Sequence, residues 1–313
     1  MSINALLLWP LIAGAALGLT GSRLGRMLPP AVAVPLLTAA ALVSALATGF
    51  ALAVAAFAVL ARVPIVSAVG HWSVAALDTG PHVPAAAGVL AGATVTALVL
   101  AAAARALRGG RELVTAALVC RDLDDAGGGL VVIEDEHPDA YALPGIRGRI
   151  VVSTAMLHAL SSDERRVLLA HEAAHLARGH HLYLQVAELS AAANPLLRPV
   201  ARAIATAVER EADEIAAAEV GDRRLAARAL ARAGLARAAA PAHRRALVGA
   251  LGNADGNVAT RAHALLAPPP PHRRILAASL TAMILVTSAV SLVTAKQTER
   301  RFETAEASYA RHA

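Results

Sequence analysis

Apolar residues gather in four long stretches of the 313-residue chain, and polar residues fill the segments between them. A helix needs roughly 20 apolar residues in a row to cross the hydrocarbon core of a bilayer. The four stretches approach or exceed this length, so the pattern predicts four transmembrane helices. They cover about residues 4–20, 31–61, 85–104 and 275–295.

The first two stretches differ from an ordinary span. Residues 4–20 have the length of a signal peptide, but no basic residue precedes them and no clear small-residue cleavage site follows them. Residues 31–61 would reach about 46 Å as a helix at 1.5 Å per residue. Because the hydrocarbon core is only about 30 Å thick, we expect the second helix to tilt or to project from the bilayer.

The segment between the third and fourth stretches is polar and predicts an α+β domain. Leu130–Ile133 and Arg149–Ser153 are short β-favouring runs bounded by proline and glycine, and they predict strands. The fold class is therefore an α-helical membrane protein with an inserted α+β domain. Its three parts are a three-span region at 1–111, the domain at 112–272, and a fourth span with a short tail at 273–313.

Three helices are predicted after the second strand. Ser161 and Glu164 have the spacing of a capping box, and the helix that they start ends at about Ala177. The second helix follows Asn194-Pro195 and runs to 220, and the third covers about 222–239.

The composition agrees with a membrane protein and argues against a nucleic-acid partner. Hydrophobic residues make up 57% of the chain and the mean hydropathy is +0.54, which is high for a soluble domain. The net charge of +6 and the pI near 10.5 resemble those of a nucleic-acid-binding protein. However, residues 112–272 contain 17 Arg against 19 Asp and Glu, so the excess positive charge lies near the apolar stretches.

Basic residues near the spans predict the orientation in the cell membrane. In a four-span arrangement, one group of basic residues faces the same side as the inserted domain: Arg23, Arg26, Arg105, Arg108, Arg111, Arg273 and Arg274. The other group is smaller: Arg62, Lys296, Arg300, Arg301 and Arg311. Positive charge near spans favours the cytoplasm, so the domain is predicted to be cytoplasmic and both termini to lie outside. The basic tail opposes this assignment.

Cys120 is the only cysteine, which excludes an intrachain disulfide and a zinc site built from thiolates. A lone cysteine also agrees with a reducing compartment such as the cytoplasm. Any metal site in this chain therefore needs histidine and carboxylate ligands.

The first predicted helix of the domain contains the sequence His171-Glu172-Ala173-Ala174-His175. Residues four apart lie on one face of a helix, so both imidazoles can bind a single ion. Glu172 projects beside that ion and can take a proton from a water molecule. The alternative is that His171 and His175 are two surface histidines of an alanine-rich helix. The motif predicts a catalytic site with one Zn²⁺ per chain.

A catalytic zinc needs a third protein ligand from another element. Glu209 lies on the next predicted helix, 34 residues after His175, and Asp213 follows four residues later on the same face. We expect Glu209 to bind the metal and Asp213 to accept the free N–H of a ligand histidine, His171. Two further acids of this helix, Glu211 and Glu214, are rival ligands, and a solvated acidic face is the alternative for all four.

The combination of His-Glu-x-x-His with Glu-x-x-Ala-Asp resembles the gluzincin-type membrane peptidases, which include HtpX-type and CAAX-processing proteases. Asn194-Pro195-Leu196 between the two motifs resembles a turn of the BlaR/MecR-type antirepressor metallopeptidases. Three spans before the domain and one after it also match that type, whereas the HtpX type is expected to have two and two. The resemblance covers nearly the whole chain and is most specific at 141–220.

The resemblance implies a zinc endopeptidase that cleaves a cytoplasmic protein, such as a transcriptional repressor. It departs at the carboxy terminus, because BlaR/MecR receptors continue into a penicillin-binding sensor and only about 18 residues follow the last span here. β-Lactam sensing by that route is therefore not implied. An HtpX-like quality-control protease is the second reading, and a non-catalytic membrane scaffold with a retained peptidase fold is the third.

Several other residues are weaker candidates. The segment Ala142-Leu143-Pro144-Gly145 resembles a part of these peptidases in which a strand edge pairs with extended substrate, but a plain structural hairpin explains it equally well. The remaining candidates are histidines and one tryptophan. We expect His180 and His181 to face solvent, His71 and Trp72 to anchor at the membrane interface, and the oxyanion-stabilising histidine to remain open among His243, His263 and His272.

Overall fold

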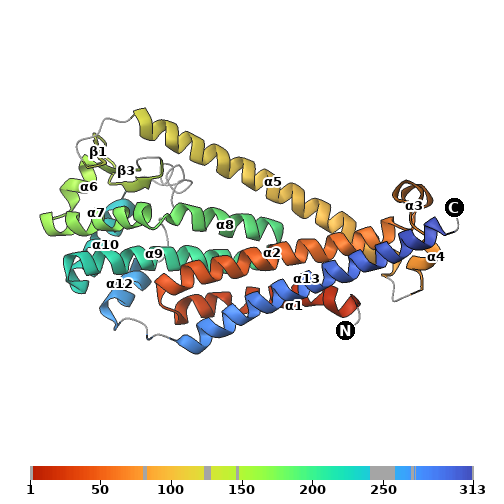
Figure 1. Ribbon diagram of the computed structural model, residues 1–313. Helices are drawn as coiled ribbons and strands as arrows, with labels where there is room; N and C mark the ends of the chain where they lie inside the picture. The colour runs from red at the N-terminus through yellow and green to blue at the C-terminus, as the bar shows by residue number, and fades with distance from the viewer. Residues whose placement is uncertain are drawn as a thin grey trace.

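Four long helices form one end of an elongated molecule, and a smaller domain of strands and helices forms the other (Figure 1). The computed structural model describes residues 3–79, 83–122, 128–145, 148–239, 258–268, 271 and 273–311. Within them, four helices are long and apolar enough to cross a membrane. They are α1 (Ile3–Met27), α2 (Pro30–Leu60), α5 (Ala85–Asp122) and α13 (Arg274–Ala310). The prediction of a multi-pass α-helical protein is confirmed.

The last two of these helices extend beyond their apolar stretches. α5 continues past residue 104 as far as Asp122, and α13 continues past residue 295 as far as Ala310. These extensions are rich in residues that favour helix, such as Ala, Arg and Glu. The extension of α5 runs towards the sheet (Figure 1). The extension of α13 runs towards α3 (Pro64–Gly70) and α4 (Val74–Leu77) at the other end of the molecule.

The α13 extension packs against the loop after α2 through aromatic rings. The Trp72 ring lies 5.2 Å from that of Phe302, and Phe57 lies 6.0 Å from Trp72 and 5.1 Å from Phe302. The His71 and Tyr309 rings are 5.8 Å apart. Both residues expected to anchor at the membrane interface thus have protein partners on α13.

The domain contains a three-stranded sheet in the order β1-β3-β2. β1 (Leu130–Ile133) pairs with β3 (Arg149–Ser153) in parallel, and β2 (Ala140–Leu143) pairs with β3 in antiparallel fashion. The sequence pattern predicts β1 and β3 but not β2, because β2 lies in a run of only five residues between two prolines and its pairing depends on β3. Residues 142–143 therefore belong to a structural hairpin, and the unpaired edge on that side belongs to β2.

Helices and one 3₁₀ turn make up the rest of the described domain. They are α6 (Thr154–Ala159), α7 (Ser162–Ala177), α8 (His180–Ala193), η1 (Pro195–Leu197), α9 (Arg198–Val220), α10 (Arg223–Ala238) and α12 (Val258–Leu266). The capping box is present: the Glu164 backbone N–H donates to the Ser161 hydroxyl and the Ser161 N–H donates to the Glu164 carboxylate. The sequence pattern does not predict α8, because this helix contacts α2, α5 and α9 on three sides and lacks a single apolar face.

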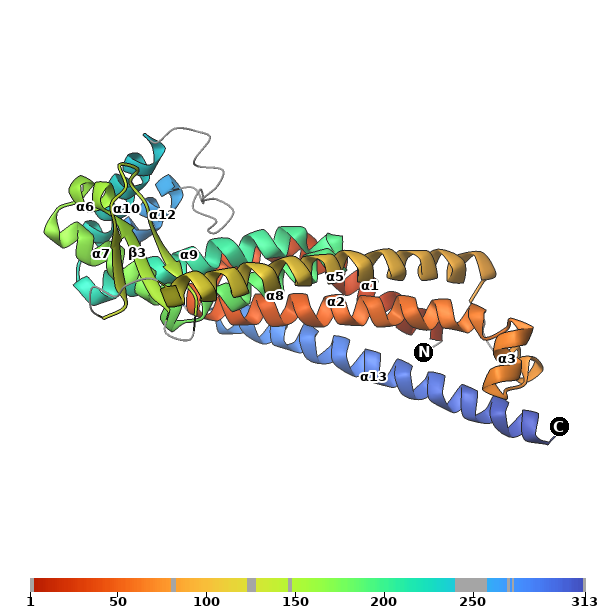
Figure 2. The same ribbon diagram turned by 90° about the horizontal axis from the view of Figure 1, so that it is seen from above.

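Helices α8 and α9 with the η1 turn form a hairpin that lies along the first two spans (Figure 2). Glycines of α1 allow the close approach. A Cβ atom on Gly18 would lie 2.2 Å from the carbonyl oxygen of Leu196, and one on Gly21 would lie 2.8 Å from Cγ2 of Val200. Because Gly18 and Gly21 have no side chains, η1 and α9 can approach the backbone of α1 closely.

A polar contact fixes the tip of this hairpin to the middle of α2. Buried Asn194 donates from Nδ2 to the hydroxyl of Thr48 at 3.2 Å, and its own Oδ1 accepts from the Leu196 N–H at 3.2 Å. Thr48 is 18 residues beyond Pro30, the first residue of α2, which corresponds to about 27 Å of helix. The hairpin thus reaches the level of the apolar stretch of α2.

Candidate metal centre

The two histidines of the His-Glu-x-x-His sequence lie one turn apart on α7, as the pattern predicts. Nε2 of His171 is 3.1 Å from Nε2 of His175, and the ring centroids are 4.8 Å apart. α7 is held at its start by the capping box and ends before Gly179, whose φ of 62° reverses the chain. Two imidazole nitrogens therefore converge on one point from a single rigid helix.

Helix α9 packs directly against α7 and brings Glu209 to the same point. Oε2 of Glu209 lies 3.8 Å from Nε2 of His171, and Oε1 lies 3.6 Å from Nε2 of His175. The three donor atoms all lie within 4.8 Å of one another. Two imidazole nitrogens and one carboxylate oxygen are the donor set of a catalytic zinc site with an open position, so these residues fit Zn²⁺.

Glu172 is buried beside this point, with a relative exposure of 6%. Burial raises the pKa of Glu172 because a carboxylate is poorly solvated there, while the charge of His171 acts in the opposite direction. Such a carboxyl group exchanges protons closer to neutral pH than an exposed one, which suits a general base and acid.

His171 contacts Asp213 through the ring nitrogen that faces away from His175. Nδ1 of His171 lies 3.1 Å from Oδ1 of Asp213. This contact leaves Nε2 of His171 directed at the point where it meets Nε2 of His175 and the Glu209 carboxylate. Burial by itself would raise the pKa of Asp213, but hydrogen bonds from Arg261 and His171 lower it to about 2. Asp213 is therefore ionised at neutral pH and fixes the orientation of the His171 ring.

Arg261 is a site residue that the sequence pattern does not predict. It is 6% exposed and binds Asp213 with Nε at 2.8 Å and Nη2 at 2.6 Å, while Nη1 lies 2.7 Å from Oε2 of Glu209. One guanidinium thus holds both carboxylates of the α9 face. Arg261 lies on α12, 48 residues beyond Asp213, and no fixed spacing links it to the motifs. A single arginine on the buried face of a mostly apolar short helix is the signal that could have indicated it.

The rival acids of α9 point to other partners. Glu211 accepts from Arg178 at 2.9 Å, and Glu214 pairs with Arg223. Neither belongs to the group of residues that could hold a metal among the described residues.

His180 does not face solvent, and that prediction is wrong. Its exposure is 1%, and its Nδ1 lies 3.0 Å from Nδ1 of His175. The left-handed Gly179 turns the chain so tightly that the first residue of α8 falls back onto the last turn of α7. His181, the next residue, is half-buried.

The pKa values of His171 and His175 shift in opposite directions. Burial lowers the pKa of His175 to about 2, and the neighbouring charges of His171 and His180 act in the same direction. Burial would also lower the pKa of His171, but the hydrogen bond to Asp213 raises it overall. His175 is thus neutral, as a metal ligand must be, and the His171 ring is held by its anion.

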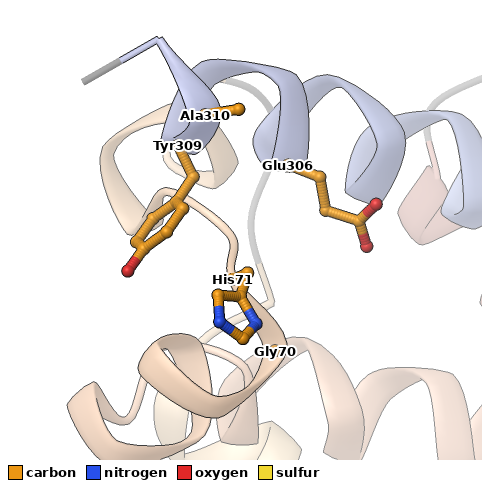
Figure 3. A pocket seen from close by; sticks show the side chains of 5 residues that line it. All are labelled: Gly70, His71, Glu306, Tyr309 and Ala310. Atoms are coloured by element: carbon orange, nitrogen blue, oxygen red, sulfur yellow. The ribbon is translucent and has the colours of Figure 1, made fainter. Parts of the chain in front are cut away.

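The other candidate histidines stay unassigned. His263 is exposed on α12, and His243 and His272 lie outside the described residues. A described cavity of about 510 Å³ lies near the carboxy-terminal end of α13, far from the candidate metal centre. Figure 3 shows His71 below Tyr309 and Glu306 at this cavity. No candidate metal ligand lines it.

Comparison with known families bears on α7 and the sheet. Residues 121–197 match peptidase family M48. The matching segment contains His171, Glu172 and His175 and ends before Glu209, so the carboxylates of α9 lie outside it. No curated protein and no solved structure matches the chain. The similarity to M48 is thus limited to this segment of a chain with four candidate membrane spans.

Proposed function

We propose that this protein is a membrane zinc endopeptidase with His171, His175 and Glu209 as metal ligands and Glu172 as general base and acid. The observation that carries the proposal is the convergence of two Nε2 atoms and one carboxylate from two helices. The M48 match over α7 supports it independently. A non-catalytic scaffold is the weaker alternative, because it would not require partners that orient both ligand histidines.

The chemistry follows from the positions of the side chains. Bound Zn²⁺ would polarise the scissile carbonyl and lower the pKa of the attacking water. Glu172 takes the proton from that water and later gives it to the leaving amine nitrogen. Asp213 and Arg261 hold His171 and Glu209 in place. The outer edge of β2 lies beside α7; Arg237 occupies the Ala140 carbonyl there, and we propose that the edge beyond Ala140 aligns an extended substrate.

A peptidase assay with the purified protein tests this proposal. Cleavage of an unfolded protein such as casein should stop on addition of a chelator and return with zinc. Glu172→Gln should keep one zinc per chain and lose cleavage, because Glu172 moves the proton without binding the metal. Glu188→Gln, an exposed site on α8, is the matched control. Equal cleavage by wild type and Glu172→Gln would contradict the proposal, and zinc-loaded wild type without any cleavage would favour the scaffold.

We further propose that the substrate is a cytoplasmic protein, with a transcriptional repressor as the leading candidate. Three candidate spans precede the domain and one follows it, which is the arrangement expected for the BlaR/MecR type. Both termini lie at the end opposite the sheet (Figure 1), as an even number of crossings requires. The division at 1–111, 112–272 and 273–313 is part of this proposal. HtpX-like quality control of membrane proteins is the second candidate function, since the M48 family includes HtpX.

Two measurements separate these possibilities. New protein amino termini in cells with wild type but not with Glu172→Gln should map to one soluble DNA-binding protein, whereas fragments of many membrane proteins would indicate quality control. For the side of the membrane, buried Cys120 should react with an impermeant maleimide only after the cells are opened and the protein is unfolded. Thr79→Cys in a Cys120→Ala background, exposed at the opposite end, should react in intact cells.

A further inference from the structure

A chain of buried polar groups leads from His175 to the surface on the side away from the metal point. Nδ1 of His180 lies 3.0 Å from Nδ1 of His175, and Nε2 of His180 lies 3.4 Å from Oε2 of Glu211. Oε1 of Glu211 accepts from Arg178, whose Nε and Nη2 lie at 2.9 and 2.8 Å. His180 and Glu211 are both less than 5% exposed, whereas the side chain of Arg178 is half exposed.

The positions of the ring nitrogens indicate which nitrogen of His175 and of His180 carries a hydrogen. Nε2 of His175 faces the other two donor atoms, so it must be free of hydrogen when a metal is bound. Nδ1 of His175 then carries the hydrogen and donates to Nδ1 of His180. Nε2 of His180 carries the remaining hydrogen and lies 3.4 Å from the Glu211 carboxylate, a charge contact without the geometry of a hydrogen bond. The chain therefore permits one neutral tautomer for each ring.

The two ligand histidines thus have parallel supports from the same helix. His171 is held by Asp213, and Asp213 by Arg261. His175 is held by a second imidazole, whose far side faces the charge of Glu211, only two residues from Asp213 on α9. Both supports end on a guanidinium that balances the carboxylate charge. An apolar side chain of similar size would fill the His180 position without supplying an acceptor.

We propose that His180 is a positioning residue that fixes the tautomer and ring orientation of His175 for metal binding, with Glu211 and Arg178 holding His180. This inference rests on the proposed metal centre and adds to it a residue outside the ligand set. Groups that orient a ligand histidine typically change metal affinity by about 10–100-fold when removed. The alternative is that His180 only fills space beneath α7.

Zinc affinity of the detergent-solubilised full chain, measured by competition with a chelator, tests the proposal. His180→Leu keeps the volume and removes the acceptor, and we expect about 10–100-fold weaker zinc binding. In His180→Asn the amide oxygen can take the place of Nδ1, so most of this affinity should return. His181→Leu, the neighbouring half-buried histidine, should bind zinc as wild type does. In the Co²⁺-substituted protein, the visible absorption bands should shift in His180→Leu and return towards wild type in His180→Asn.

The outcomes are distinguishable from failure of the metal centre itself. If wild type binds no zinc, the proposed function fails. If wild type binds zinc and His171→Ala does not, but His180→Leu binds as tightly as wild type, only the role of His180 fails. Equal losses of zinc affinity in His180→Leu and His180→Asn would also overturn it. In that case a hydrogen-bond acceptor at this position would have no effect on zinc binding. Should His180→Leu not fold, the Asn variant and Glu211→Gln, for which we expect a smaller loss and a Co²⁺ band shift, decide the question.

Discussion

The two halves of α9 are held in different ways. Residues 198–208 pack among apolar and small side chains of α1 and α2, where Val200, Ile204 and Val208 are fully buried. Residues 209–220 carry carboxylates whose partners are histidines and arginines. The first half lies along the spans and the second half lies against α7.

The apolar half of α9 determines where the helix lies, and the charged half carries the groups that could bind a metal. Apolar packing has no preferred charge and depends on shape, so glycines such as Gly21, which faces Val200, determine where α9 lies. Buried carboxylates repel one another and need cations at defined distances; Arg261 supplies one, and the proposed zinc ion would supply another. We therefore expect changes in the first half to affect stability and changes in the second half to affect metal binding.

The largest effect is expected from the metal ligands. His171→Ala, His175→Ala or Glu209→Ala should each remove zinc from a protein that otherwise carries about one ion per chain, because two protein ligands hold a catalytic zinc poorly. Elemental analysis of the purified variants measures this. Glu214→Ala, whose side chain pairs with Arg223, should keep its zinc. Unchanged zinc in Glu209→Ala would remove α9 from the metal centre.

A smaller effect, with a defined dependence on zinc, is expected for Arg261→Met. The variant leaves Asp213 and Glu209 buried without their cation, which should cost about 3–5 kcal/mol of stability in the zinc-free protein. Bound zinc supplies positive charge at the same place, so the loss should be less when zinc is present. Thermal unfolding with chelator and with zinc measures both values. Asp78→Asn, which weakens an exposed pair with Arg62 at the opposite end of the molecule, should cost about 0–1 kcal/mol and show no dependence on zinc.

Next in size is a change on α1 beside η1, the turn that leads into the apolar half of α9. Gly18→Ala places a methyl group where the Leu196 carbonyl lies, at 2.2 Å, and should cost about 1–3 kcal/mol of stability. Gly49→Ala, at a helical glycine of α2 with no neighbour within 4 Å, should instead stabilise by about 0.5–1 kcal/mol. Thermal unfolding of the two variants gives the comparison. Zinc loss in Gly18→Ala without a loss of stability would contradict the division of α9 into two halves.

The smallest effect concerns pH and the start of α7. Burial opposes ionisation of Glu164, but hydrogen bonds from Ser161 and the charge of Arg232 lower its pKa overall. A lowered folded-state pKa adds stability that is complete above the unfolded value of about 4.5 and is lost as pH falls through the folded value. Glu164→Gln should therefore be about 1 kcal/mol less stable than wild type at pH 7, and the difference should shrink below pH 4.5. Zinc affinity at pH 7 should not change.

The sequence predicts those parts of the candidate site whose spacing is set by helix geometry alone. His171 and His175, like Glu209 and Asp213, are four residues apart on helices, and helix geometry places each pair on one face. β2 and α8 depend on tertiary contacts that no local pattern indicates, whereas Asn194-Pro195 marks the turn at η1 in the sequence itself. Arg261 reaches the site from a distant helix. His180 needed knowledge of the left-handed Gly179, because an ordinary helix end would have turned its ring to solvent.

X-ray absorption at the zinc edge of the purified, zinc-loaded protein tests the central claim most directly. The account predicts nitrogen and oxygen neighbours only, at about 2.0–2.2 Å, with outer-shell scattering from two imidazole rings. Glu209→Ala should lower the zinc content while the two-imidazole signal of any remaining metal persists. Scattering from three imidazoles, or from one, would contradict a centre built from His171, His175 and Glu209.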